Sequence, residues 1–166
     1  MAVTGTDQLQ SLRRMMRNVG ISLVLFAVVV ALVLPLRWTG GPGLYLPLAL
    51  SVISIGAVPL LGRLKPLPIG VSDAKARNDA RNAFVVAMFR QMAGAQAPAL
   101  AALAGSFVEE SMVPYLICGA VSVILFFGAV YPSDARIARA ERKLDSEGGH
   151  SELRATLASP PSPTLS

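Results

Sequence analysis

Long apolar runs alternate with short polar segments along the chain, and four of the runs are long enough to cross a membrane. They cover residues 19–36, 44–61, 83–107 and 112–131. Each run has about the 17–25 residues that a helix needs to span roughly 30 Å of hydrocarbon. The pattern predicts an all-α, polytopic membrane protein whose four transmembrane helices form two hairpins.

The alternative, a soluble helical protein, is disfavoured by the first run. Within residues 21–36 the single polar side chain is Ser22, so a helix there has no polar face to turn toward water. The whole chain is 53% hydrophobic and 15% charged, whereas average soluble proteins are about 25% charged. Composition and pattern therefore both favour the membrane.

The segments outside the runs are short and polar. Taken alone, none has enough apolar residues to bury a core of its own. We therefore expect one membrane domain, residues 19–132, preceded by a cytoplasmic N-terminal segment, residues 1–18. A basic amphipathic helix, residues 133–145, and a disordered tail, residues 146–166, are expected to follow.

The distribution of Lys and Arg predicts the orientation, because cytoplasmic loops carry an excess of both. The segments between the first and second runs and between the third and fourth carry one Arg in total, Arg37. Both termini and the middle loop are therefore expected in the cytoplasm. The basic residues of the N-terminal segment, middle loop and tail are Arg13, Arg14, Arg17, Arg63, Lys65, Lys75, Arg77, Arg81, Arg136, Arg139, Arg142, Lys143 and Arg154.

The same basic segments indicate the partners. Because the positive charge lies beside the apolar runs, we expect contact with anionic lipid headgroups and no nucleic-acid partner. The bias toward Arg, Ala and Gly suggests a bacterial genome of high GC content, so we expect a multi-pass protein of the bacterial inner (plasma) membrane.

Two further helices are predicted around the runs. One long helix is expected from about Ser72 to Phe107, with its first third in the cytoplasm or among headgroups. In the tail, Ser133 is a suitable N-cap, and Ile137, Ala140 and Leu144 then fall on one side of a basic helix. That helix either lies on anionic headgroups or continues the fourth run into solvent.

Strongly polar residues occur in one run only, the third, as Arg90, Gln91 and Gln96. Arg90 either snorkels at the cytoplasmic interface or lies deep and binds an anion or headgroup. Gln96 is expected to form a hydrogen bond with another helix, with Ser51, Ser54 and Ser122 as candidate partners. The alternative is that Arg90, Gln91 and Gln96 line a small polar path.

A stripe of small residues follows the third run. Ala93, Ala97, Ala101 and Gly105 recur every four residues, and Gln96 shares their face. Small residues at this spacing allow the backbone of another helix to approach closely. We predict that these five residues form a helix-packing face, either inside the bundle or between two copies.

Chemistry-bearing motifs are absent from the sequence. Cys118 is the one cysteine, His150 is the one histidine and lies in the tail, and no Asp or Glu lies inside a run. A carboxylate-coupled carrier, a multi-cysteine metal site and a histidine-based acid–base site are therefore all disfavoured. We expect no enzymatic activity, no catalytic residue, no cofactor and no bound metal.

One segment resembles a known family. Gln96-Ala97-Pro98-Ala99-Leu100, with the small residues and second apolar helix that follow, resembles a hairpin of rotary-ATPase proteolipid (c) subunits. The chain also resembles small four-helix membrane proteins of bacteria. The proteolipid resemblance implies a helical hairpin that packs in a membrane assembly. The proteolipid needs a mid-membrane carboxylate where this chain has Gln96, so no ion-binding residue is carried over.

These observations lead to two functional hypotheses. The first is a non-catalytic integral membrane protein that forms a homo-oligomer or serves as an accessory subunit of a larger membrane complex. The alternative is a small transporter or channel component with a polar path near Gln96 and Arg90. A path requires polar groups that face water, whereas a packing subunit requires polar groups that bind neighbouring helices.

Overall fold

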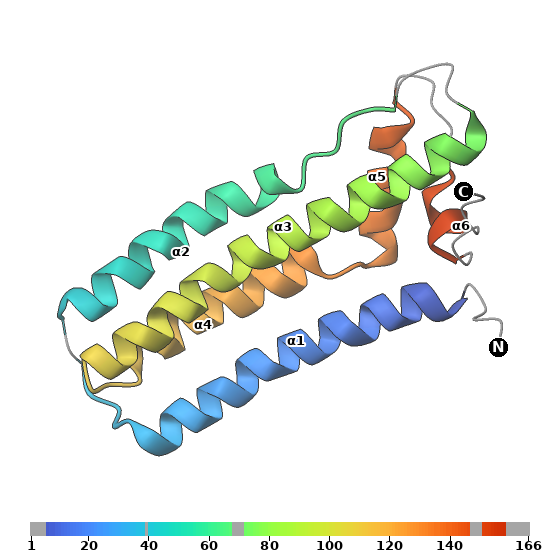
Figure 1. Cartoon of the computed structure of the whole chain (residues 1–166). Coiled ribbons are helices and arrows are strands. Elements are labelled where there is room, and N and C mark those ends of the chain that lie inside the picture. The colour runs from blue at the N-terminus through green and yellow to red at the C-terminus, as the bar shows by residue number, and fades with distance from the viewer. Residues whose placement is uncertain (1–5, 39, 68–71, 147–150, 159–166) are drawn as a thin grey trace, which may run out of the picture. The chain divides into compact units, whose positions relative to one another are not determined.

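The computed structural model describes residues 6–38, 40–67, 72–146 and 151–158, and their regular structure is entirely helical (Figure 1). The predicted all-α class is confirmed. The helices are α1 (Thr6–Val33), α2 (Pro42–Leu61), α3 (Asp73–Val108), α4 (Val113–Leu125) with its π-helical continuation (Phe126–Val130), α5 (Asp134–Leu144) and α6 (Leu153–Ala158).

Three helical segments within the described residues are long and apolar enough to cross a membrane. They are Leu9–Val33, Pro42–Leu61 and Val113–Val130, which correspond to the first, second and fourth predicted runs. The third run is helical as predicted, within one unbroken helix that begins at Asp73. It is less apolar than the others because it consists largely of Ala and Gly and contains Gln91 and Gln96.

The chain divides into two compact units. We call the first the polar unit, formed by Met1–Met16, Arg63–Ala87 and Pro132–Ser166. The second is the apolar unit, formed by Arg17–Gly62 and Met88–Tyr131. Helices α1 and α3 contribute to both units. The three polar-unit segments are the N-terminal segment, middle loop and tail that the charge pattern assigned to one side of the membrane.

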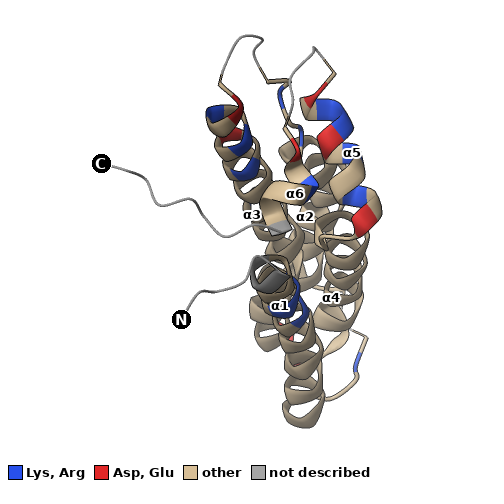
Figure 2. Cartoon of the chain, turned by 90° about the vertical axis from the view of Figure 1, so that its right-hand side faces the viewer, with Lys and Arg blue, Asp and Glu red and all other residues tan. Residues whose placement is uncertain are grey.

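The apolar unit contains α2, α4, most of α1 and the second half of α3, which run beside one another (Figure 1). Its interior is built from small and medium side chains of α1, α3 and α4. Figure 2 shows α2 and α4 without a charged residue. Large apolar side chains of α1, α2 and α4 point outward, as expected in hydrocarbon. The buried cluster consists of Leu23, Val30, Ala99, Ala102, Tyr115 and Cys118, and examples of the exposed side chains are Leu25, Leu32, Val52, Ile53 and Ile124.

The polar unit has a cluster of buried apolar side chains of its own, which the prediction of one membrane domain did not include. The N-terminal segment, middle loop and tail are each too short to bury a core alone, whereas in the structure they pack together. Ion pairs join Arg13 to Asp134 at 2.7 Å and Arg77 to Glu152 at 3.0 Å. The core residues are Leu67, Ala76, Ala80, Phe84, Ile137, Ala140, Leu144, Leu153 and Leu157.

Helix α5 begins where the sequence predicted, and the Ser133 hydroxyl accepts the Arg136 backbone N–H as its N-cap. Its apolar side, with Ile137, is buried in the polar-unit core rather than free to enter a lipid surface. The Arg136 guanidinium lies 5.9 Å from the centre of the Phe84 ring. Burial lowers the pKa of Arg136 to about 10, which leaves it charged at neutral pH.

Part of the tail that was predicted to be disordered is helical in the structure. Residues 153–158 form helix α6, and Leu153 and Leu157 are buried because their spacing of four places both on one helical face. Residues 147–150, which include His150, and residues 159–166 lie outside the described residues.

Candidate functional site

Gln91 joins α3 to the end of α2. Its Nε2 donates a hydrogen bond of 2.9 Å to the backbone carbonyl of Val58, and the side chain is 5% exposed. Val58 lies in the last turn of α2, where carbonyls lack partners within the helix. Gly62 leaves room for this cap, because a Cβ there would overlap the Gln91 carboxamide. Gln91 therefore caps the last turn of α2.

Ser122 of α4 forms a hydrogen bond with the backbone of α3 beside Pro98. The Ala99 N–H donates to the Ser122 hydroxyl at 3.1 Å, and Ser122 is fully buried. Proline interrupts the hydrogen bonds of a helix, and in hydrocarbon neighbouring hydroxyls must satisfy the groups that become free. This contact explains why a serine lies in the middle of an otherwise apolar helix.

Tyr115 connects α4 to α1 and α3. Its hydroxyl donates to the Leu23 carbonyl at 3.0 Å, and its backbone N–H donates to the Ser106 hydroxyl at 3.0 Å. Both Tyr115 and Ser106 are buried. Each helix of the apolar unit is thus bound to another by at least one polar contact with backbone.

At the other end of α2, two glycines allow α2 and α3 to touch through their backbones. A Cβ on Gly105 would overlap the Gly43 carbonyl oxygen, and a Cβ on Gly43 would lie 2.7 Å from the Gly105 carbonyl oxygen. The Gly43 N–H donates to Oε1 of Glu109 at 2.8 Å. Glu109 therefore caps the first turn of α2, where N–H groups are unpaired and negative charge is favourable.

The segments that precede α2 and α4 are also joined. The Ser111 hydroxyl donates to the Arg37 carbonyl, and the Met112 N–H donates to the Pro35 carbonyl at 3.1 Å. Glu110 closes α3 in the left-handed region, with φ of 49°. The two loops that the charge pattern placed on one side therefore lie at the same end of the apolar unit.

The predicted helix-packing face matches the structure at one of its five residues. Gly105 is buried, but Gln96, Ala97 and Ala101 are half-buried and Ala93 is exposed. The inward face of α3 lies instead along Gln91, Ala95, Ala99, Ala102 and Ser106. The contacts of Gln91, Ala99 and Ser106 determine which side of α3 faces inward, and the spacing of the alanines alone does not. The predicted packing face, inside the bundle or between two copies, stays a prediction.

Gln96 has none of its expected partners. Ser122 accepts from Ala99, and the Ser51 hydroxyl donates to the Pro47 carbonyl of its own helix. Among the described residues no hydrogen bond to the Gln96 side chain is recorded. Arg90 is exposed, whereas its neighbour Gln91 points inward. Arg90, Gln91 and Gln96 therefore do not converge on one lining.

Sequence reasoning missed the residues that make the closest contacts, namely Gly43, Ser106, Glu109 and Ser111. The available signal was the pair of glutamates after an apolar run, since a carboxylate is favourable near the N-terminus of a helix, and the glycine-rich loop before α2 leaves such an end open to approach. No group of three or more His, Cys, Asp or Glu suited to a metal ion occurs in the described part of the chain.

Comparison of the chain with protein-family models, with curated protein sequences and with solved structures finds no match.

Proposed function

We propose that this chain is a non-catalytic, four-helix membrane protein that self-assembles or serves as an accessory subunit of a larger membrane complex. The observation that carries the proposal is the use of buried polar groups in the apolar unit. Gln91, Ser122 and Tyr115 each bond the backbone of a neighbouring helix. Polar groups used in this way hold helices together and leave no hydrated lining.

The fourth span in this proposal is residues 91–108 of α3. A helix of that length rises about 27 Å, close to the thickness of the hydrocarbon core. Its bonds to α2 and α4, which are both apolar enough to span, support placing it beside them. Arg90 then lies at the boundary and reaches the headgroups.

The orientation in this proposal follows from charge. Twelve of the fifteen Lys and Arg residues belong to the segments of the polar unit, which places that unit in the cytoplasm by the positive-inside rule. Both termini are then cytoplasmic, and the exposed basic residues such as Arg139 and Arg142 can meet anionic headgroups. The compartment is the inner membrane of a bacterium.

Self-assembly is supported by the outer side of α3. Ala93 and Ala97 are small and not buried, and Gln96 beside them carries an amide with no partner among the described residues. An unpaired amide in hydrocarbon is costly, so a helix of a second copy or of another subunit would satisfy it. A transport path has less support, because Gln91 is occupied by Val58.

Cysteine crosslinking in native membranes tests the self-assembly. In a Cys118→Ala background, Ala97→Cys should give a disulfide-linked dimer on mild oxidation. Val52→Cys, exposed on α2, is the matched control and should remain monomeric. Equal crosslinking of both variants, or of neither, would remove α3 as the face between copies.

Affinity purification of a tagged copy in mild detergent, with mass spectrometry of the bound proteins, separates the two forms of the proposal. A stoichiometric larger protein would make this chain an accessory subunit, and a homo-oligomer alone would make it self-assembling. A monomer with no partner would contradict both and favour transport, with Arg90 and Gln96 as the first positions to change.

A further inference from the structure

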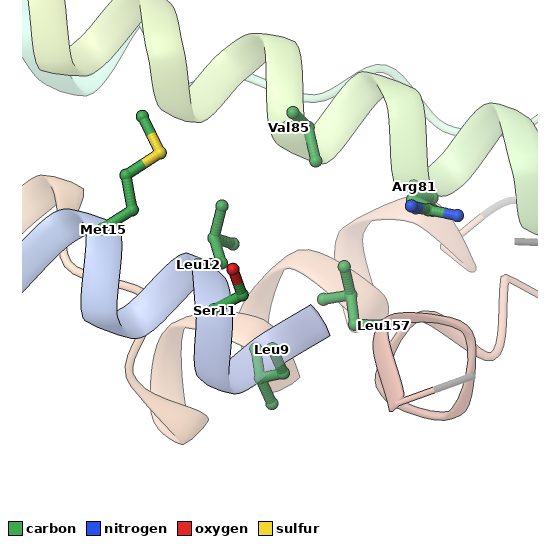
Figure 3. A pocket seen from close by; sticks show the side chains of 7 residues that line it. All are labelled: Leu9, Ser11, Leu12, Met15, Arg81, Val85 and Leu157. Atoms are coloured by element: carbon green, nitrogen blue, oxygen red, sulfur yellow. The ribbon is translucent and has the colours of Figure 1, made fainter. Parts of the chain in front are cut away.

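A groove of about 290 Å³ opens in the polar unit between α1, α3 and α6. Figure 3 shows Leu12 and Met15 extending from α1 toward α3, and Val85 extending from α3 toward them. Leu157 of α6 lies at one end of the groove (Figure 3). The lining consists of Leu9, Ser11, Leu12, Met15, Arg81, Val85 and Leu157.

The chemistry of the lining is amphiphilic. Five of its seven side chains are apolar, and the polar ones are one hydroxyl, Ser11, and one guanidinium, Arg81. Arg13 and Arg77, which lie near in sequence, are each held by a carboxylate. Arg81 forms no recorded ion pair with any residue that the structure describes. The groove therefore offers an apolar surface with one guanidinium, for which no ion pair is recorded among the described residues.

We propose that this groove binds an anionic phospholipid, with part of one acyl chain against Leu12, Met15 and Val85 and the phosphate at Arg81. The positive charge of Arg81 favours an anionic headgroup, and the apolar side chains of the groove favour an acyl chain. The volume of about 290 Å³ is below the about 300–1,000 Å³ of typical small-molecule pockets. It therefore suits part of an acyl chain better than a compact metabolite.

The position of the groove selects a membrane lipid as the source. Leu9, Leu12 and Met15 form the first two turns of the candidate span Leu9–Val33. Because α1 continues from the groove into that candidate span, the nearest source of an anionic amphiphile is the lipid of the adjoining membrane surface. The inference goes beyond the proposed function, because it assigns a ligand whether or not the chain assembles with others.

Lipid retention by the full-length protein tests the proposal. The protein would be purified in mild detergent, loaded with phosphatidylglycerol or phosphatidylcholine, and examined by native mass spectrometry. We expect preferential retention of phosphatidylglycerol. Arg81→Gln should weaken its binding about fivefold, which corresponds to about 1 kcal/mol for one basic side chain near an anionic surface. Lys75→Gln removes an exposed charge of the same helix outside the groove and is the control.

A second pair of variants tests the apolar wall. Val85→Trp fills the groove and should abolish the preference, whereas Val86→Trp places the same ring on the exposed side of α3 and should not. If Val85→Trp fails to fold, Met15→Gln, at a position already 43% exposed, replaces it with the same expectation.

Three results would overturn the proposal. The first is equal retention of the two lipids by the unchanged protein. The second is unaltered phosphatidylglycerol binding in both Val85→Trp and Met15→Gln. The third is displacement of the lipid by millimolar inorganic phosphate, which would leave a phosphate site without a chain site.

Discussion

The two units of this chain use polar and apolar contacts in opposite ways. The apolar unit is joined helix to helix by a few polar groups and by one contact between glycines. The polar unit, rich in charge, is joined by a cluster of buried apolar side chains, while the two ion pairs among its described residues are at the surface. In each unit, the side chains that join the segments are of the type that is less common there: polar in the apolar unit and apolar in the polar unit.

The surroundings that we propose for the two units, water for the polar unit and hydrocarbon for the apolar unit, would account for this difference. In water, removal of apolar surface drives association, so the charged segments pack through Phe84, Ile137 and Leu144. In hydrocarbon, apolar side chains gain little from each other that lipid does not already supply, so close backbone approach and hydrogen bonds decide which helices pair. Residue changes in the two units should therefore have different consequences.

The largest effect is expected at the glycine contact. Gly105→Ala would push a Cβ into the Gly43 carbonyl oxygen, and backbone cannot turn away as a side chain can. We expect a loss of about 3 kcal/mol or more, as for severe overpacking. Gly56→Ala, in α2 with no atom within 4 Å of the added Cβ, is the matched control and should be neutral or stabilising. Unfolding titrations in mixed detergent would measure both, and equal effects would disprove the contact.

Shortening a buried apolar side chain should lower the stability of the polar unit. Shortening an exposed one on the outside of the apolar unit should lower stability much less. Ile137 is 1% exposed and Ile124 is 70% exposed. Ile137→Ala should cost about 2–3 kcal/mol, because it leaves a cavity in a core. Ile124→Ala should cost less than about 0.5 kcal/mol in detergent. Limited proteolysis would identify the affected unit, and an undisturbed polar unit in Ile137→Ala would contradict the core that we describe.

The two glutamines of α3 offer the sharpest contrast within the apolar unit. Gln91→Leu removes the cap on Val58 and leaves a buried carbonyl unpaired, so a loss of about 1 kcal/mol is expected. Gln96→Leu removes no recorded bond and should leave the folded monomer as stable as before. Thermal unfolding of both variants in one detergent tests this. A larger loss in Gln96→Leu would mean that its amide is bound within the chain.

Much of the fold follows from local sequence pattern. The apolar runs predicted the long helices, the stretch without breakers after Ser72 predicted one long helix that continues to about Phe107, and Ser133 predicted the start of α5. Each of these features depends on residues within a few turns of each other. Local hydrogen bonding and period therefore suffice to predict them.

The contacts could not be predicted in the same way, because they join residues distant in the chain. The inward face of α3 is chosen by Val58, Ser122 and Tyr115, and nothing in the alanine spacing refers to them. The polar-unit core had a weak local signal in Ala76, Ala80 and Phe84, which recur every four residues on a charged helix. Leu153 and Leu157 repeat that spacing in the tail. Such a signal becomes meaningful only when the partner segments are considered together.

The smallest effect is expected at the surface ion pair of the polar unit. Arg77 and Glu152 lie 3.0 Å apart, but their side chains are 44% and 58% exposed. Water and salt screen such pairs, so Arg77→Gln should cost less than about 0.5 kcal/mol. Lys75→Gln, also exposed and with no ion pair recorded among the described residues, should match it. A loss above about 1 kcal/mol that disappears in 1 M salt would contradict this expectation. If the prediction holds, the neutral hydrogen bond from Gln91 to Val58 contributes more than a full ion pair, because hydrocarbon offers an unbound amide no alternative partner and water does.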